Sequence, residues 1–196
     1  FEEGAKKGAE IAGAGTKVYT DFNEAINDPD VNAVVVTTPG AFHKDPVIAA
    51  IKAGKPVFSE KPLANTAADC KAVVDAEMAS GKHLVQVGFM RRYDRGYRQV
   101  KELLDSGKFG APMVVKCTHR ADGVAPDYTT SMAVTDTAIH EIDVLPWLVG
   151  DEWDEVQCIM PKSSSKAHEG LKDPQVMIPL WLSWAAMRPP ARWTSS

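Results

Sequence analysis

The chain has 196 residues, of which 44% are hydrophobic and 24% are charged, proportions that are typical of a folded soluble protein. The formal net charge of -4 leaves no basic excess to neutralise a phosphate backbone, which argues against a nucleic-acid partner. The three cysteines lie far apart without metal-ligand spacing, so we expect neither a metal nor a disulfide framework. The sequence also lacks a bilayer-long apolar run and a signal-peptide layout, so we expect a cytoplasmic protein with no membrane partner.

Short β-branched runs alternate with helical stretches up to Phe89, the pattern of βαβ units in a mainly parallel sheet. The run VNAVVVTT, residues 31–38, is nearly all apolar and predicts a strand covered on both faces. Asp21 is placed to cap a helix, and Gly54 and Gly81 are placed to end two more. We predict helices over residues 1–12, after 21, over 43–53 and over 66–80, and strands over 17–20, 31–38, 55–59 and 83–89.

The amino-acid composition changes after Phe89, where the charged and aromatic stretch RRYDRGYRQ begins, and we place a domain junction there. The second half predicts helices over residues 96–106 and 133–149, strands over 113–120 and 155–160, and loops over 121–130 and 161–175. Residues 176–196 carry three of the five tryptophans and no acidic residue, unlike their surroundings. The predicted organisation is therefore a first domain over 1–89, a second over 90–175 and an aberrant tail over 176–196.

The tripeptide Glu60-Lys61-Pro62 follows a predicted parallel strand, at the edge where open α/β sheets bind ligands. A lysine at this edge, beside a cationic nicotinamide ring, is a candidate for relaying a proton. The alternative is a surface lysine in a turn, and the tripeptide alone does not decide between the two.

The predicted helix over residues 133–149 presents two stripes at about 100° per residue. One stripe is apolar and is expected to face the core, while the opposite one contains an Asp/His pair. Apolar neighbours indicate that the second stripe is covered too, and a covered histidine held by a carboxylate suits the removal of a proton from an alcohol. The alternative is a solvated surface pair. The first stripe consists of Val134, Ala138, Ile142, Leu145 and Val149, and the second of Asp136, His140, Asp143 and Trp147.

Other polar residues lie near strand ends. Thr37, Thr38 and His43 flank the end of the strand over 31–38, where they can contact a dinucleotide or serve as turn and cap residues. Arg91 and Arg92 form either a clamp for a polar ligand or a solvated charge pair. The segment Gly13-Ala14-Gly15 follows a helix, and this chain contains no GxGxxG after a strand, so a phosphate loop is not predicted in it.

Taken together, VVVTTPGAFH, GKPVFSEKPLA, VQVGFMRRYD and DTAIHEID resemble the Gfo/Idh/MocA family of oxidoreductases over roughly residues 1–176. The resemblance implies an α/β fold: an incomplete Rossmann domain with a doubly wound parallel sheet, followed by an incomplete α+β domain with an open, mostly antiparallel sheet. It implies NAD as the cofactor, with NADP not excluded, and a homotetramer. The implied reaction oxidises the C2 hydroxyl of myo-inositol to scyllo-inosose. Another sugar or polyol as substrate, or a non-catalytic remnant, are the alternatives.

The resemblance also implies residue roles. Lys61, Asp136 and His140 are expected to be catalytic and, with Arg91, to bind the substrate. The expected cofactor-binding residues are Thr37, Thr38, His43, Glu60, Lys61 and Arg91. Two departures stand out: the family's glycine loop is not found in this chain, and the tail over 176–196 suggests a reading-frame error or a truncated gene.

Overall fold

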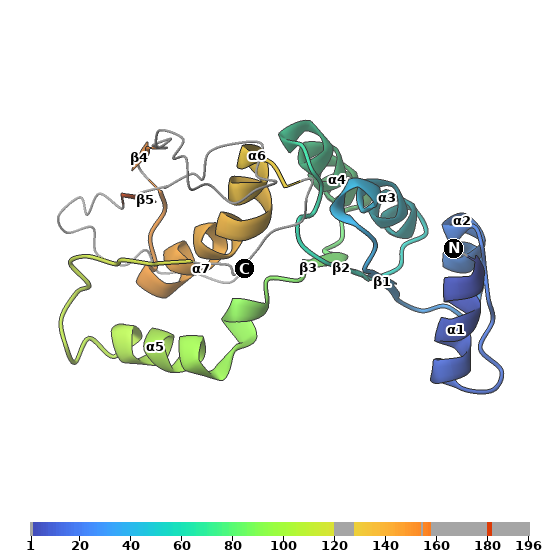
Figure 1. The fold of residues 1–196 in the computed structure, drawn as a ribbon, viewed down its shortest axis with the longest axis horizontal. Coiled ribbons are helices and arrows are strands. Elements are labelled where there is room, and N and C mark those ends of the chain that lie inside the picture. Colours follow the sequence, from blue (N-terminus) through green and yellow to red (C-terminus); the bar gives the residue numbers. More distant parts are fainter. Residues whose placement is uncertain (1, 120–127, 154, 158–179, 182–196) are drawn as a thin grey trace, which may run out of the picture. The chain divides into compact units, whose positions relative to one another are not determined.

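The computed structural model describes residues 2–119, 128–153, 155–157 and 180–181 (Figure 1). The chain divides into two compact units, Phe1–Phe89 and Met90–Ser196, and each is described by itself. Among the described residues, the helices are all too short or too polar to cross a membrane.

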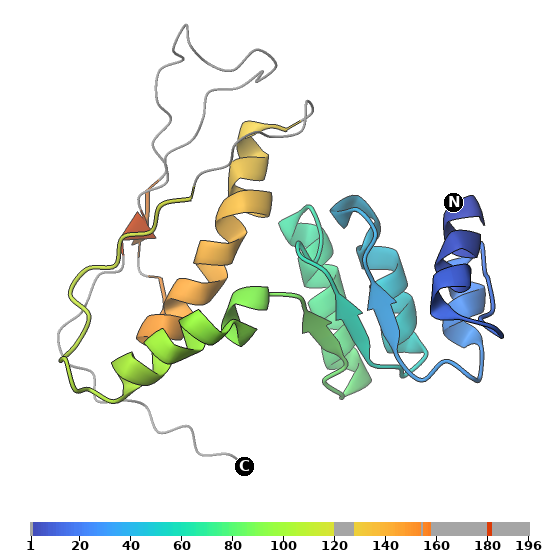
Figure 2. The same ribbon diagram turned by 60° about the horizontal axis from the view of Figure 1, so that its bottom comes forward.

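The first unit is built on a parallel sheet of three strands, β1 (Val34–Val36), β2 (Val57–Ser59) and β3 (Val85–Val87). Val57 of β2 lies opposite Val34 on one side and Val85 on the other. The crossovers are helix α3 (Lys44–Lys52), which follows the short 3-10 turn η1 (Gly40–Phe42), and helix α4 (Ala67–Ser80). Figures 1 and 2 show both helices on one side of the strands. The predicted parallel sheet is therefore confirmed.

The helix ends follow local signals in the sequence. The Thr66 hydroxyl accepts a hydrogen bond from the backbone N–H of Asp69 at 3.1 Å, which starts α4. This helix ends at Gly81, whose φ of 65° is in the left-handed region. Asp21 caps α2 (Phe22–Asn27) in the same way as Thr66 caps α4. The helix α1 (Glu2–Ala12) completes the unit, so the predicted helices of this half are all found.

The core of the first unit lies between the sheet and helices α3 and α4. It is formed by Ile26, Val36, Val47, Ala50, Ile51, Val57 and Val73. The opposite sheet face is open, because Val35 is 68% exposed and its neighbour across the ladder, Phe58, is 37% exposed. The prediction that residues 31–38 are covered on both faces is therefore wrong for this structure: the apolar run marks the strand, but a run of valines carries no information on how many faces are packed.

The predicted strand over residues 17–20 is also wrong, since the structure assigns this segment to neither strand nor helix. Side-chain bonding holds it instead. The Lys17 ammonium lies 2.7 Å from a carboxylate oxygen of Asp28 and 2.7 Å from one of Asp30. The Tyr19 hydroxyl also bonds to Asp28. Polar residues at alternate positions thus connect the segment to the loop after α2. The pattern of residue types that predicted a strand does not show these side-chain contacts.

The second unit contains two main helical segments. The 3-10 turn η2 (Met90–Tyr93) leads into α5 (Arg95–Asp105). Further along, α6 (Thr130–Met132), the π-helical segment η3 (Ala133–Ala138) and α7 (Ile139–Val149) follow one another directly and end at Gly150. Two short strands, β4 (Glu155–Val156) and β5 (Leu180–Trp181), pair in antiparallel fashion. The predicted helices over 96–106 and 133–149 are confirmed within a few residues.

The buried face of the long helical segment differs from the predicted stripe. The side chains buried in α7 are Glu141, Val144, Leu145 and Leu148, so that only Leu145 belongs to the predicted core stripe. Val144, Leu145 and Leu148 pack with Tyr97, Leu104, Trp147 and Trp153. The prediction assumed α-helical spacing from residue 133 onward. Residues 133–138 are instead π-helical, with i→i+5 hydrogen bonds, so one α-helical stripe does not run through both segments.

The strand predicted over residues 113–120 is wrong for the part that the structure describes. Residues 113–119 are assigned to no strand. Met113 and Val114 are 88% and 86% exposed, so successive side chains do not alternate between a buried and an open face. Several predictions extend outside the described residues: Arg120, residues 121–127 of the loop predicted over 121–130, residues 158–160 of the strand predicted over 155–160, the loop predicted over 161–175 and most of the tail.

Candidate active site

In the first unit, the loops that follow the three parallel strands meet at one edge of the sheet. Thr37 and Thr38 follow β1 and are exposed, whereas Glu60 and Lys61 follow β2 and are half-buried. The ladder continues past the strand ends, because the N–H of Glu60 donates to the carbonyl of Val36 at 2.9 Å. The structure therefore brings four of the predicted cofactor-binding residues to the carboxyl edge, where ligands of open α/β sheets bind.

The loops at this edge are in close contact. A Cβ atom on Gly40 would lie 2.9 Å from the ring of Pro62 and 2.9 Å from the side-chain oxygen of Asn65. A Cβ atom on Gly88 would lie 2.9 Å from the ring of Phe58 and 3.2 Å from a carboxylate oxygen of Glu60. Both glycines have negative φ, so their small size is used for close approach and not for a left-handed turn.

Lys61 begins a tightly organised turn. Its backbone N–H donates to the carboxylate of Glu60 at 3.2 Å, and the peptide bond from Lys61 to Pro62 is cis. His43 is 1% exposed and lies beside this turn, with both ring nitrogens near backbone carbonyls. Of the residues predicted to contact the cofactor, His43 is thus the one whose side chain is fully enclosed by the protein.

In the second unit, Asp136 lies in the π-helical segment η3 and His140 lies in the first turn of α7. Both residues are half-buried, so the Asp/His face is not a freely solvated one. The Tyr128 hydroxyl and the Thr137 hydroxyl lie 2.6 Å apart, which anchors η3 beside Asp136. π-helical turns within α-helices recur at functional sites, and the catalytic assignment of this pair stays a prediction.

Arg91 is paired with a carboxylate that the sequence did not single out. Its guanidinium donates to the buried Glu141, and their side chains are 16% and 11% exposed. His119 contributes a ring nitrogen 3.3 Å from the same carboxylate. The guanidinium also lies over the Tyr97 ring, 5.6 Å from its centroid.

Arg92 makes a bidentate ion pair with Asp143, whose side chain is 10% exposed. Two consecutive arginines of η2 are thus bound by two carboxylates of α7. The two alternatives from the sequence, a ligand clamp and a solvated charge pair, did not include this arrangement. Its signal in the sequence is the pair of carboxylates in HEID, which lie two residues apart.

The ionic groups around Glu141 also affect a thiol. Burial raises the pKa of Cys117, and the negative charge of Glu141 raises it further, while Arg91 opposes this shift. A thiol kept protonated is a poor nucleophile or metal ligand. In the described part of the chain, no group of three or more His, Cys, Asp or Glu side chains is arranged to hold a metal ion.

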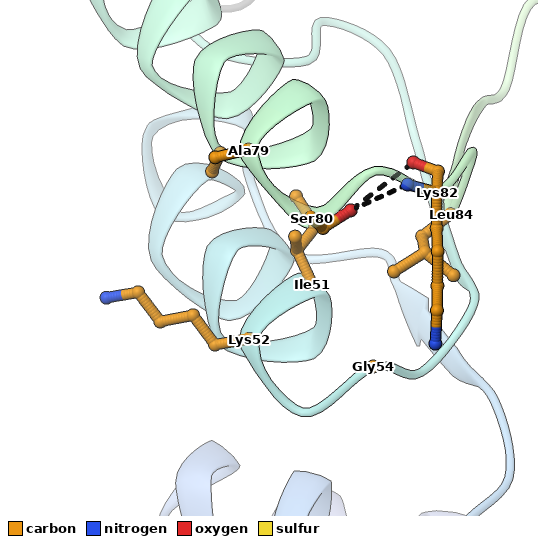
Figure 3. Close-up of a pocket in the computed structure, with 8 residues that line it drawn as sticks. Ile51, Lys52, Gly54, Ala79, Ser80, Lys82 and Leu84 are labelled. Atoms are coloured by element: carbon orange, nitrogen blue, oxygen red, sulfur yellow. Dashed lines mark hydrogen bonds between the residues drawn. The ribbon is translucent and has the colours of Figure 1, made fainter.

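A pocket of the first unit lies away from the loops that follow β1 and β2 (Figure 3). It is lined by Ile51, Lys52, Gly54, Ala76, Ala79, Ser80, Lys82 and Leu84. These residues come from the ends of α3 and α4 and from the approach to β3, which is the amino edge of the sheet. Its two lysines extend in different directions in Figure 3, so they do not converge on one ligand.

Comparison with protein families decides which fold this edge belongs to. Residues 2–89 match the oxidoreductase family with an NAD-binding Rossmann fold, GFO_IDH_MocA, and residues 97–179 match the GFO/IDH/MocA C-terminal domain. The chain belongs to the Gfo/Idh/MocA family. Its first unit is therefore a Rossmann domain with a parallel sheet, as the resemblance implied, and it is followed by the family's C-terminal domain.

Two curated relatives are both inositol 2-dehydrogenases. The protein from Azotobacter vinelandii is 53% identical over 176 residues, which are 90% of this chain and 52% of the relative. The protein from Serratia proteamaculans is 54% identical over 162 residues, which are 83% of this chain and 48% of the relative. The chain thus spans about half the length of the curated relatives it matches.

Solved structures agree with this family. A myo-inositol dehydrogenase from Lactobacillus casei, in complex with NAD(H) and myo-inositol, is 42% identical with a TM-score of 0.81 and covers 90% of this chain and 53% of its own. A scyllo-inositol dehydrogenase from the same organism, with NAD(H) and scyllo-inositol, is 29% identical with a TM-score of 0.58 and covers 73% of this chain and 44% of its own.

Proposed function

We propose that the protein oxidises the C2 hydroxyl of myo-inositol to scyllo-inosose with NAD as the hydride acceptor. The observations that carry the proposal are a Rossmann sheet edge that bears Lys61, and an Asp/His pair in which Asp136 lies on the π-helical segment η3 and His140 in the helix that follows it. The sequence identity of 53% and 54% to two curated inositol 2-dehydrogenases supports the choice of substrate.

The cofactor would supply a nicotinamide ring that accepts the hydride from C2. The carboxyl edge fits such a group, because exposed Thr37 and Thr38 and half-buried Glu60 follow adjacent parallel strands there. We assign these residues, with Arg91, to NAD binding. NADP remains the alternative cofactor, because the acidic residue that reads the ribose is not identified in this chain.

The remaining chemistry is one proton transfer. As the hydride leaves C2, the hydroxyl loses its proton to the imidazole of His140, and the carbon–oxygen single bond becomes the ketone. Asp136 orients that imidazole and stabilises its charged form, while Lys61 binds the reacting oxygen.

A second candidate function is oxidation of another inositol isomer or sugar. The similarity to a scyllo-inositol dehydrogenase supports it, although the identity is lower than to the myo-inositol enzyme. From the same family relationship we propose that the protein is cytoplasmic and that it assembles as a homotetramer. Light scattering of the purified protein measures that assembly directly.

The test is a titration of the purified chain with NAD, followed by measurement of NADH formation with myo-inositol, scyllo-inositol and simple aldoses. We expect saturable NAD binding in the micromolar range and turnover that is fastest with myo-inositol. Faster turnover of another polyol would replace the substrate but keep the reaction. The absence of both NAD binding and turnover would contradict the proposal and leave the chain as a non-catalytic remnant.

A further inference from the structure

The buried histidine beside the Lys61 turn contacts both of the loops that form the candidate site. His43 is 1% exposed, and its Nδ1 lies 2.7 Å from the carbonyl oxygen of Pro62. Its Nε2 lies within hydrogen-bond distance of the carbonyl oxygen of Thr38. One imidazole therefore bridges the loop after β1 and the loop after β2.

Both partners of the ring are hydrogen-bond acceptors. A carbonyl oxygen has no proton to give, so the ring must be the donor, and a neutral imidazole has one N–H, which it donates to one of the two carbonyls. A buried carbonyl that loses its donor is unfavourable, which opposes any rotation or withdrawal of the ring. A side chain that served the cofactor directly would have a nitrogen open to the ligand, whereas those of His43 face Thr38 and Pro62.

A second contact joins the same two loops. Gly40 approaches Pro62 and Asn65 so closely that a Cβ atom would lie 2.9 Å from each. The backbone N–H of Phe42 donates to the carbonyl of Pro39 at 2.8 Å, which holds Gly40 inside a tight turn. The two loops are thus in contact at Gly40 and are bridged by His43. Lys61 directly precedes Pro62, so the position of the Pro62 carbonyl affects the position of Lys61.

We propose that His43 is a positioning residue, whose imidazole sets the place of Lys61 by holding the carbonyl of Pro62 against the loop of Thr38. The inference rests on the proposed role of Lys61. It assigns to His43 a function that differs from cofactor contact, namely control of the geometry of the neighbouring lysine through the backbone.

Two amide variants separate the two contacts. In His43→Asn the side-chain nitrogen takes the place of Nδ1 and can still donate to Pro62, but Thr38 loses its partner. In His43→Gln the nitrogen takes the place of Nε2 and can still donate to Thr38, but Pro62 loses its partner. His43→Leu removes both ring nitrogens and keeps an apolar side chain in the buried site.

The first readout is amide hydrogen exchange in the full chain, with no cofactor or substrate added. The amide of Lys61 reports on the second loop, that of Phe42 on the first, and that of Val57 on the core of the sheet. We expect His43→Gln to accelerate exchange at Lys61 by roughly threefold to tenfold, the factor for one hydrogen bond, and His43→Asn to do so at Phe42. His43→Leu accelerates both, and Val57 stays protected.

The second readout is the rate at which an amine-reactive reagent labels the side chain of Lys61, measured at a series of pH values. We expect a changed pH profile in His43→Gln and His43→Leu and the original profile in His43→Asn, while exposed Lys52 is labelled equally in all. Equal effects of the Asn and Gln variants, or loss of protection at Val57 in both, would overturn the inference in favour of a general packing role. Neither readout uses NAD or inositol, so a failure of this inference can be distinguished from a failure of the proposed reaction.

Discussion

At the scale of single residues, Lys61 and His140 carry the proposed chemistry most directly. We predict that Lys61→Ala and His140→Ala each lower the turnover of myo-inositol by at least about 100-fold, the usual effect of removing help with proton transfer. The affinity for NAD, measured by titration, should change less in His140→Ala than in Lys61→Ala, because His140 is assigned to the substrate hydroxyl. Steady-state NADH formation provides the measurement.

Lys52→Ala is the matched control for the lysine. Lys52 is exposed in the last turn of α3, at the opposite edge of the sheet from Lys61. We expect it to have normal turnover. A near-normal rate in Lys61→Ala or His140→Ala would refute the role assigned to that residue.

Sequence reasoning found the residue types at the site but missed how several of them are held. Lys61 was located because the residue after a parallel strand has a fixed place at the sheet edge. The enclosure of His43 and the pairing of Arg91 with Glu141 depend on contacts across nineteen and fifty positions of the chain. No local pattern encodes such contacts.

At the scale of elements, Glu77 of α4 connects its helix to the start of β3. One of its carboxylate oxygens accepts hydrogen bonds from the N–H groups of Leu84 and Val85 at 2.7 and 2.8 Å. We predict that Glu77→Ala lowers the free energy of opening β3 by about 1 to 3 kcal/mol, because two backbone donors lose their acceptor. Hydrogen exchange of the β3 amides measures this change.

Two variants test whether the effect comes from the acceptor. Glu77→Gln keeps an oxygen in place and should cost clearly less than the alanine variant. Asp75→Ala removes a carboxylate from the same helix, but its ion pair with Lys71 is exposed and should contribute at most about 0.5 kcal/mol. Equal destabilisation by Glu77→Ala and Asp75→Ala would contradict the assigned connection.

The elements that the sequence predicted correctly have their signals within a few residues. Asp21 caps α2 and Gly81 ends α4, and both act as predicted. The errors have a different origin. The buried face of α7 was mispredicted because the stripe was counted from apolar residues alone, whereas the buried face includes Glu141, which pairs with Arg91. The open face of β1 was missed because the packing of a valine run is decided by other segments.

At the scale of the whole chain, the sequence change after Phe89 coincides with the division into two compact units. Four motifs in order led to the family, and the family models then matched both units. Such motifs are informative because several of them in a fixed order are far more specific than any one of them. The local periodicity of either half, taken by itself, is shared by many unrelated proteins.

Charge also connects distant segments of the first unit and makes its stability depend on pH. Hydrogen bonds from Lys17, Tyr19 and the backbone of Asp30 hold the pKa of Asp28 below its ordinary value of 3.8. The ammonium of Lys44, with help from the Thr66 hydroxyl, lowers the pKa of Asp69 in the same way. The carboxylate forms are therefore favoured by folding.

The sign of the effect follows from these shifts. Each carboxylate contributes stability that is fully present above its unfolded pKa and is lost as the pH falls below 3.8 toward the folded value. We predict that the opening free energy of the first unit falls as the pH drops below about 4, and that Asp28→Asn makes this fall shallower. Hydrogen exchange of the Val57 amide, measured as a function of pH, tests the prediction. An unchanged slope in Asp28→Asn would show that the Lys17–Asp28 bond does not stabilise the unit.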